Sequence, residues 1–354
     1  MAGDGLSRDE LVDKVRHGEI LEGVDLSGAD LAGLPLAGAI FEKANLTGAI
    51  LAGADLHESV FNDTVLSEAD LSTSNLRHAN AIGCTATATR FSGALMLGFK
   101  SIDCAFERAV FDDVDLTLGA FVNPIITDAR FHHAKLERCS FLDAQTPRVD
   151  FGGALMKNTV VMKADLTEAN FTGAALEGAI FIGSRLAGKD LRGLDLTLAQ
   201  LMDADLRGVD LSDCNLTQTN FKSADLTGAK LDGATAPRAL FVEANLEGAS
   251  LSKTELFQSI FLGARLHQAN CSGAQMKQCI LHDATVTQVR FEKTELEYAD
   301  FSRADLSESV FSRCGLFRTR FHRTIENGTT FDSRKLALGD DSLLAEAETW
   351  EPKH

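Results

Sequence analysis

The chain has 354 residues, of which 45% are hydrophobic and 24% charged, and its formal net charge at pH 7 is −17. This composition excludes two classes of protein: no run of about 18 apolar residues could span a membrane, and the surplus of acids opposes sequence-independent binding to nucleic-acid phosphates. The opening residues, MAGDGLSRDE, lack the basic and apolar segments of a signal peptide. A cytoplasmic location is therefore expected, with a contact-dependent secretion system as the route of any export.

Residues 1–20 predict an N-terminal helical cap. Ser7 and Glu10 have the spacing of a capping box, and Gly18 is placed to end the helix. An open stack of strands exposes unpaired backbone groups at its ends. We therefore expect a helix over residues 8–17 to close the end of the repeat region that follows.

A repeat of five residues fills the middle of the chain. A large apolar residue, usually Leu or Phe, returns at every fifth position from Leu21 to Phe331, giving 63 pentads without an insertion or deletion. The position two residues before each of these centres is small almost throughout. Helices repeat their apolar residues every 3.6 positions and strands every 2, so the period of five belongs to the architecture. Residues 21–335 are predicted to form one repeat domain.

Phenylalanine indicates how many pentads make one turn. Of 19 Phe at centres, ten lie on one 20-residue series, which includes Phe41 and Phe61, and eight lie on a series offset by ten, which includes Phe91 and Phe111. Because five is odd, all centres stay inside only if the chain bends once in every pentad. The sequence therefore predicts an all-β, quadrilateral parallel β-helix (solenoid) of about 16 coils with short terminal helices, about 75 Å long at a strand spacing of about 4.8 Å.

The residue types that carry chemistry follow the repeat. Six of the seven cysteines occupy the small inward position and Cys271 is a centre, so we expect buried thiols that behave as small apolar side chains. Seven histidines, including His322, are placed at outward positions. No nucleophile elbow, phosphate-binding loop or metalloprotease motif occurs. The sequence predicts no catalytic residues, no metal site and no cofactor, and a protein that is not an enzyme.

One segment departs from the pattern. The centres Ala81, Ala86 and Ser101 are small, and Phe99 stands where a small residue belongs. Residues 81–101 are therefore expected to form a distorted waist. Compensating packing, in which Phe99 fills the space that Ser101 leaves, is favoured over a docking site.

One wall carries apolar residues where solvent-facing residues are expected. The positions after the centres of the first Phe series are apolar in most coils, and several positions before these centres are apolar as well. The predicted protein-binding residues on this wall are Ile82, Ile102, Val122, Leu142, Met162, Ile182, Met202, Val242, Leu262, Ile180 and Ile260. At one coil per step the stripe is about 45 Å long. Exposed apolar patches with polar rims usually mark interfaces.

Acidic residues run beside this stripe at the next outward position. The predicted rim consists of Asp103, Asp143, Asp203 and Glu243. An alternative explanation of the stripe is that β-branched side chains stack coil on coil, which favours Ile and Val without any partner. Methionine in the stripe and its confinement to one wall favour an interface, with another copy of the chain or with a different protein.

Residues 336–354 predict an acidic C-terminal helix and tail. The segment DDSLLAEAETW favours a helix over residues 342–350, with Asp341 or Ser342 as its N-cap. Its apolar side chains form a further predicted binding group: Leu343, Leu344 and Trp350. This segment is either a second cap or a peptide that binds in a groove of a partner.

The motif A(D/N)LxG, as in residues 29–33 and 224–228, resembles that of the pentapeptide-repeat family over some 310 residues. The resemblance implies a right-handed β-helix used for binding and scaffolding, with no catalytic residues in the repeat. Two segments are similar to members of the family associated with type VI secretion: HGEILEGVDLSGADLAGLPLAGAIF, which begins at His17, and LRGLDLTLAQLMDADLRGVDLS, which begins at Leu191. This similarity implies an adaptor for spike or effector proteins. Other members are acidic DNA mimics that protect gyrase. The net charge fits that second function, whereas the apolar stripe fits it poorly. The predicted partner is thus a protein, with no direct binding to nucleic acid or membrane.

Overall fold

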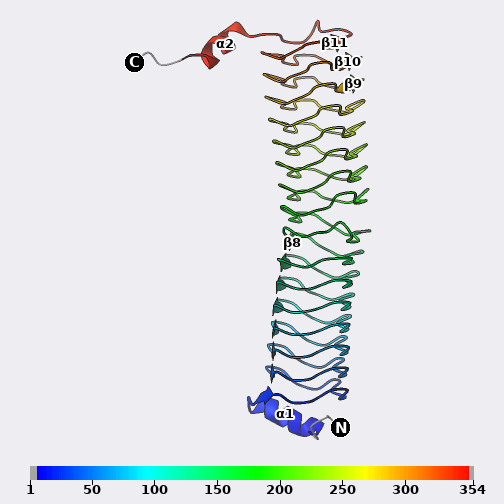
Figure 1. Cartoon of the computed structure of the whole chain (residues 1–354), viewed down its shortest axis with the longest axis vertical. Helices are drawn as coiled ribbons and strands as arrows, with labels where there is room; N and C mark the ends of the chain where they lie inside the picture. Colours follow the sequence, from blue (N-terminus) through cyan, green and yellow to red (C-terminus); the bar gives the residue numbers. More distant parts are fainter. Residues whose placement is uncertain (1–5, 351–354) are drawn as a thin grey trace. The chain divides into compact units, whose positions relative to one another are not determined.

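The computed structural model describes residues 6–350 and divides the chain into two compact units, residues 1–185 and 186–354. In each unit the chain winds as a parallel β-solenoid with a 20-residue coil, and the two units together contain about 16 turns (Figure 1). The predicted fold class is confirmed.

The regular elements of the described residues are short. The helices are α1 (Arg8–Arg16) and α2 (Ser342–Glu348), and neither is long or apolar enough to cross a bilayer. The strands of the first unit are β1 (Ile20–Glu22), β2 (Ile40–Glu42), β3 (Val60–Asn62), β4 (Asn80–Ile82), β5 (Lys100–Ile102), β6 (Ala120–Val122), β7 (Ser140–Leu142) and β8 (Val160–Val161). Those of the second unit are β9 (Arg290–Glu292), β10 (Val310–Ser312) and β11 (Thr330–Phe331).

Each coil pairs with the next along four lines, which makes the solenoid four-sided. In the first unit one line is the eight-stranded parallel sheet β1 to β8, and the other three consist of single bridges between residues 20 positions apart. The four lines begin with Ile20 opposite Ile40, Asp25 opposite Asn45, Asp30 opposite Ile50, and Pro35 opposite Asp55. The period of 20 inferred from phenylalanine is thus the register of the sheet.

The core consists of stacked centres. Phe111 and Phe131, one coil apart, stack with ring centroids 4.7 Å apart and planes inclined by 3°. Phe111 also meets Phe121 of the other series edge to face, with centroids 6.4 Å apart. In the second unit Phe241 and Phe261 stack at 4.7 Å. Small residues at the second inward position leave room for these rings, because offset stacking and edge contacts need centroids about 4.5–7 Å apart.

The corner two residues after almost every centre has a left-handed backbone. Glycine adopts this conformation without strain, as at Gly48 with φ 63°, but Asp103 and Lys163 adopt it too, with φ 52° and 54°. A non-glycine residue there costs about 1–2 kcal/mol. The ladder of hydrogen bonds between coils imposes the conformation, so the corner is left-handed even where the sequence has no glycine.

The segment 81–101 is regular, and the prediction of a distorted waist is wrong. Ala81 pairs with Ser101 and Ser101 with Phe121 in the same register as the other coils. Phe99 is buried, and its ring centroid lies 5.9 Å from that of Phe121. The Phe99 ring thus occupies volume that a short side chain at residue 101 leaves, and the backbone does not need to shift. The Ser101 hydroxyl is buried without a hydrogen-bond partner.

The two helices begin at predicted caps. In α1 the Ser7 hydroxyl accepts a hydrogen bond from the Glu10 N–H (3.2 Å), and the Glu10 carboxylate accepts one from the Ser7 N–H (2.8 Å), which completes the capping box. Asp341 is the N-cap of α2, but this helix ends at Glu348, two residues before its predicted end. The C-cap is Thr349, whose N–H bonds back to the last turn.

Candidate protein-interaction surface

Strands β4 to β7 hold four of the predicted wall residues of the first unit, and the other three follow in the next two coils. The middle residue of each strand is in the core and its neighbours face outward, so the sheet has one outer face. Ile82 and Ile102 are 43% and 42% exposed and Leu142 is 39% exposed. The outward apolar residues that we call the apolar wall are Ile82, Ile102, Val122, Leu142, Met162, Ile180 and Ile182, all of them exposed or half-buried.

The apolar residue changes place along this sheet. In β1 to β3 the residue before the centre is Ile or Val and the residue after it is Glu or Asn. In β4 and β5 the order is reversed, with Asn80 and Lys100 before the centre and Ile82 and Ile102 after it. The apolar residues that follow the centres, which make up most of the apolar wall, therefore begin at Ile82.

The other predicted wall residues lie in the second unit. Met202, Val242 and Ile260 are half-buried and Leu262 is exposed. A coil with Lys222 at the equivalent position separates Met202 from the other three. The predicted stripe is thus distributed over two units, and Met202 does not join the apolar residues of its own unit.

Acidic residues flank the wall as predicted from their positions. Asp103 and Asp143 are exposed at left-handed corners, and Asp103 accepts a hydrogen bond from Asn123 (2.9 Å). Within residues 6–350 neither carboxylate makes an ion pair. Asp203 and Glu243 are likewise exposed in the second unit. Within the described chain Asp103 and Asp143 are therefore carboxylates without an ion pair, and Lys163 occupies the same corner one coil after Asp143.

Helix α2 contacts the second unit through its polar side. Glu348 forms ion pairs with Arg303 (2.9 Å) and Arg323 (3.0 Å), and Arg323 also donates to the Ala345 carbonyl (3.0 Å). The predicted binding residues are accessible: Leu343 is 77% exposed, Trp350 71%, and Leu344 is half-buried. Leu343 in the helix and Trp350 just after it thus face solvent, although the segment also packs on the last coils.

His322 is buried, and its predicted outward exposure is wrong. The C-terminal segment covers it: the Asp341 N–H donates to Nδ1 (3.1 Å), and Nε2 lies 3.4 Å from Glu348. Burial alone would raise the pKa of Glu348, but the hydrogen bond from His322 and the charges of Arg323 and Arg303 lower it overall. Pentad position predicts which way a side chain points, but not whether a terminal segment folds over it.

The residues with nucleophilic or metal-binding groups are dispersed. All seven cysteines are free thiols, six of them buried and Cys314 half-buried, and burial raises the pKa of Cys271 to about 12. No group of three or more His, Cys, Asp or Glu side chains that could hold a metal ion occurs among residues 6–350.

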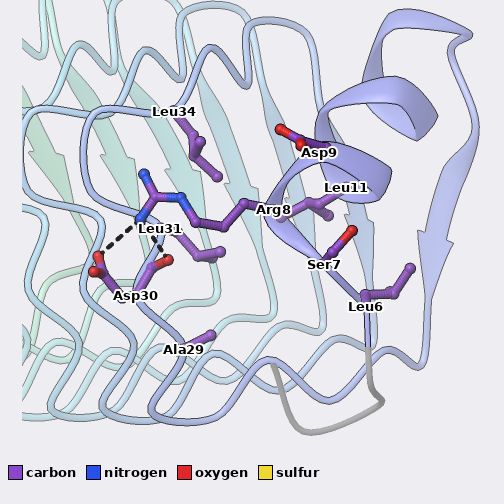
Figure 2. A pocket seen from close by; sticks show the side chains of 9 residues that line it. All are labelled: Leu6, Ser7, Arg8, Asp9, Leu11, Ala29, Asp30, Leu31 and Leu34. Atoms are coloured by element: carbon purple, nitrogen blue, oxygen red, sulfur yellow. Dashed lines mark hydrogen bonds and ion pairs between the residues drawn. The ribbon is translucent and has the colours of Figure 1, made fainter. Parts of the chain in front are cut away.

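A cavity of about 540 Å³ lies between α1 and the first coil (Figure 2). Arg8 crosses it and donates to the carbonyls of Asp30 (2.9 Å) and Ala32 (2.6 Å). One coil later, the carbonyl of Ile50 is equivalent to that of Asp30, and it accepts a hydrogen bond from the Leu31 N–H in the preceding coil. Arg8 thus supplies the hydrogen bonds that a preceding coil would have supplied, and the cavity belongs to the N-terminal cap.

Exposed leucines also occur on another face of the first unit, but singly. Leu95 and Leu155 are 37% and 43% exposed. Along their line of bridges the two coils between them carry Asp115 and Lys135 at this position. Apolar exposure by itself therefore does not mark the apolar wall. Its distinguishing feature is that exposed or half-buried apolar residues follow one another in consecutive coils.

A family model described as pentapeptide repeats matches eight segments of the chain, which together cover well over half of it. The matched segments are residues 25–63, 39–77, 54–96, 148–181, 181–213, 199–235, 244–283 and 287–323. No curated protein gave a significant match to the chain.

Several solved structures resemble the chain at low sequence identity. HetL, a pentapeptide repeat protein involved in heterocyst differentiation regulation in Nostoc sp. strain PCC 7120, is 22% identical, with 77% of this chain and 95% of HetL covered and a TM-score of 0.32. Rfr23 from Cyanothece 51142 is 18% identical, with 44% and 91% covered and a TM-score of 0.24. QnrB1, a plasmid-mediated fluoroquinolone resistance protein, is 18% identical, with 76% and 100% covered and a TM-score of 0.20.

Proposed function

The chain belongs to the pentapeptide-repeat family, and from that premise we propose that it is a non-enzymatic scaffold that binds another protein through the apolar wall of its first unit. The observation that carries the proposal is the row of apolar side chains on consecutive coils from Ile82 to Met162, in which Ile82, Ile102 and Leu142 are exposed and Val122 and Met162 are half-buried. Covering these side chains with a partner would contribute a favourable free energy of roughly 25 cal/mol for each Å² of apolar surface removed from water. A rigid sheet also loses little conformational freedom on binding.

Packing between coils is the competing explanation of the same residues. Stacked β-branched side chains stabilise neighbouring strands by roughly 0.2–1 kcal/mol per pair. Leu142 and Met162 are not β-branched, and Leu142 remains 39% exposed between its neighbours. The wall therefore retains surface that neighbouring coils do not bury.

The specific role that we propose is an adaptor in type VI secretion, which docks spike or effector proteins. It is supported by the similarity of the sequence around the first coils, HGEILEGVDLSGADL, to pentapeptide-repeat proteins of that system. The binding groups of this adaptor are the apolar wall with its acidic rim and the exposed residues of α2.

A second candidate function is that of a DNA mimic that binds and protects gyrase, and the net charge of −17 favours it. However, 16 of the 51 acids are those that the repeat places before its centres. Many of these carboxylates are also neutralised in the structure: Arg90 pairs with Asp70 at 2.7 Å and Arg185 with Asp165 at 2.7 Å. An apolar wall is a poor imitation of a phosphate backbone, so we rank this function second.

The test compares tagged wild type with a wall variant, Leu142→Asp with Ile182→Asp, and with a control variant, Leu95→Asp with Leu155→Asp. The control puts the same charges at exposed leucines of another face of the same unit. Each protein is incubated with lysate of the source organism, cross-linked and captured, and its partners are identified by mass spectrometry. Thermal unfolding is measured in parallel.

We expect proteins of the secretion machinery to be captured by wild type and control and lost from the wall variant, with similar unfolding of the three proteins. Gyrase subunits captured equally by all three would establish the second function in place of the first. Selective destabilisation of the wall variant, with partners retained, would show that the wall serves packing between coils.

A further inference from the structure

We infer that the element that binds the apolar wall is an amphipathic α-helix of the partner, lying along the solenoid axis, with basic residues on the flank that faces the acidic rim. This inference rests on the proposed function and specifies the chemistry of the partner. It is carried by the width of the wall, by the spacing of its side chains and by its charge.

The wall is as wide as one helix. Its strands have two or three residues, which corresponds to about 10 Å at about 3.3 Å per residue. An α-helix with its side chains is about 10–12 Å in diameter. A second sheet has several strands side by side and would be wider than this wall, so its outer strands would have no contact with it. A single helix has the same width as the wall.

The spacing along the wall favours a helix over an extended peptide. Ile82 and Ile182 are five coils apart in sequence register, or about 24 Å at about 4.8 Å per coil. Five turns of helix rise about 27 Å, whereas five pairs of residues in an extended strand rise about 33 Å. Side chains at intervals of three and four residues in a helix therefore stay opposite successive wall residues over the whole distance. The alternate side chains of an extended strand no longer match the wall residues after two or three coils.

The acidic rim follows the same spacing. Asp103 and Asp143 of the rim, with Asp63 at the same corner two coils before Asp103, occupy every second coil, about 10 Å apart, and Lys163 ends the series. None of the three carboxylates has an ion-pair partner in the described chain, residues 6–350. Residues seven apart in a helix are also about 10 Å apart. Lys or Arg at every seventh position of a partner helix would thus meet each carboxylate in turn.

Charge also discriminates against a second copy of the chain. Another copy would bring its own unpaired acids, and each chain has a net charge of −17. Like charges brought together at an interface oppose association, and opposite charges increase both its rate and its specificity. Two copies of the chain would place like-charged carboxylates opposite each other, whereas a basic partner would place opposite charges there.

The experiment measures the binding of a defined helix to the full chain. The probe is a fluorescein-labelled 18-residue peptide of Leu and Lys, with Leu at intervals of three and four and Lys on one flank. The control peptide has the same composition in an order that forms no apolar face. Binding is measured by fluorescence anisotropy at about 0.15 M salt, where charges more than about 8 Å apart are screened.

Two pairs of variants separate the wall from general attraction to an acidic protein. The wall variant is Ile102→Ser with Leu142→Ser, and its control is Leu95→Ser with Leu155→Ser. The rim variant is Asp103→Asn with Asp143→Asn. Its control, Asp113→Asn with Asp213→Asn, removes two exposed carboxylates from left-handed corners of other walls, with φ 56° and 58°.

We expect the amphipathic peptide to bind at least tenfold more tightly than its permuted control. The wall variant should lose about tenfold in affinity and the rim variant about threefold, with both controls unchanged. Equal binding of the two peptides, or equal losses in variants and controls, overturns the inference. If the peptide test fails but the variant used for capture, Leu142→Asp with Ile182→Asp, loses the partner that wild type captures, the proposed function stands and the partner has another shape. If that variant also retains the partner, both proposals fail.

Discussion

Phe99 and Ser101 offer a test of how the repeat tolerates an inverted pentad. The usual pentad has a small residue two positions before a large centre, whereas here the large residue comes first. Both side chains are buried, and both lie beside Phe121. If they share one volume, restoring the usual order in a double variant should repair what each single substitution damages.

The expected magnitudes follow from burial. Phe99→Ala leaves a cavity and should destabilise the protein by about 3–5 kcal/mol. Ser101→Leu adds volume beside an intact Phe99 and should cost about 1–3 kcal/mol. The double variant should be more stable than the sum of the two predicts by about 2–3 kcal/mol, since both residues lie beside Phe121 and share that neighbour. Ser101→Ala removes a buried hydroxyl that has no partner and should stabilise the protein by about 1 kcal/mol.

The assay is urea unfolding followed by circular dichroism, with amide hydrogen exchange across residues 79–121. Exchange is needed because repeat proteins can unfold in segments, and a single transition then underestimates local effects. Local protection should fall in both single variants and recover in the double variant. A double variant as unstable as the sum of its parts would refute the idea that Phe99 fills the space at residue 101.

Three further predictions concern the ends of the chain and its thiols. Ser7→Ala should weaken α1 by about 1 kcal/mol, seen as faster amide exchange in this helix but not in coils of the second unit. The pKa of Glu348 is lowered, so its contribution to the docking of α2 is present above its ordinary value of 4.5 and is lost as the pH falls through the lower, folded pKa. The fluorescence anisotropy of Trp350, the only tryptophan, should therefore hold from pH 7 to 4.5 and drop below it, whereas Glu348→Gln should lower it already at pH 7. Among the thiols, half-buried Cys314 should react first with a disulfide reagent, with the buried six reacting only on unfolding; early reaction of Cys139 would contradict the described packing.

The pentad pattern was sufficient to predict the coil. A large residue at every fifth position can remain buried only in a chain that turns at each pentad, so Phe111, Phe131 and their stack follow from spacing alone. The same rule correctly placed Ile82, Ile102 and Leu142 on an outer face, because a residue next to a buried centre in a strand must point outward. The capping box of Ser7 and Glu10 is local and was equally readable.

Contacts made by the segments outside the repeat required the tertiary structure. His322 occupies an outward pentad position, yet it is buried because residues 340–348 fold back over it, and no periodicity describes that path. Arg8 reaches the carbonyls of Asp30 and Ala32 only because α1 lies across the first coil. The regular waist at Phe99 likewise depends on a ring filling space in three dimensions. The position of a residue within the repeat predicts whether it faces the core or solvent. The contacts of the terminal segments, and of residues that break the repeat, depend on how the whole chain folds.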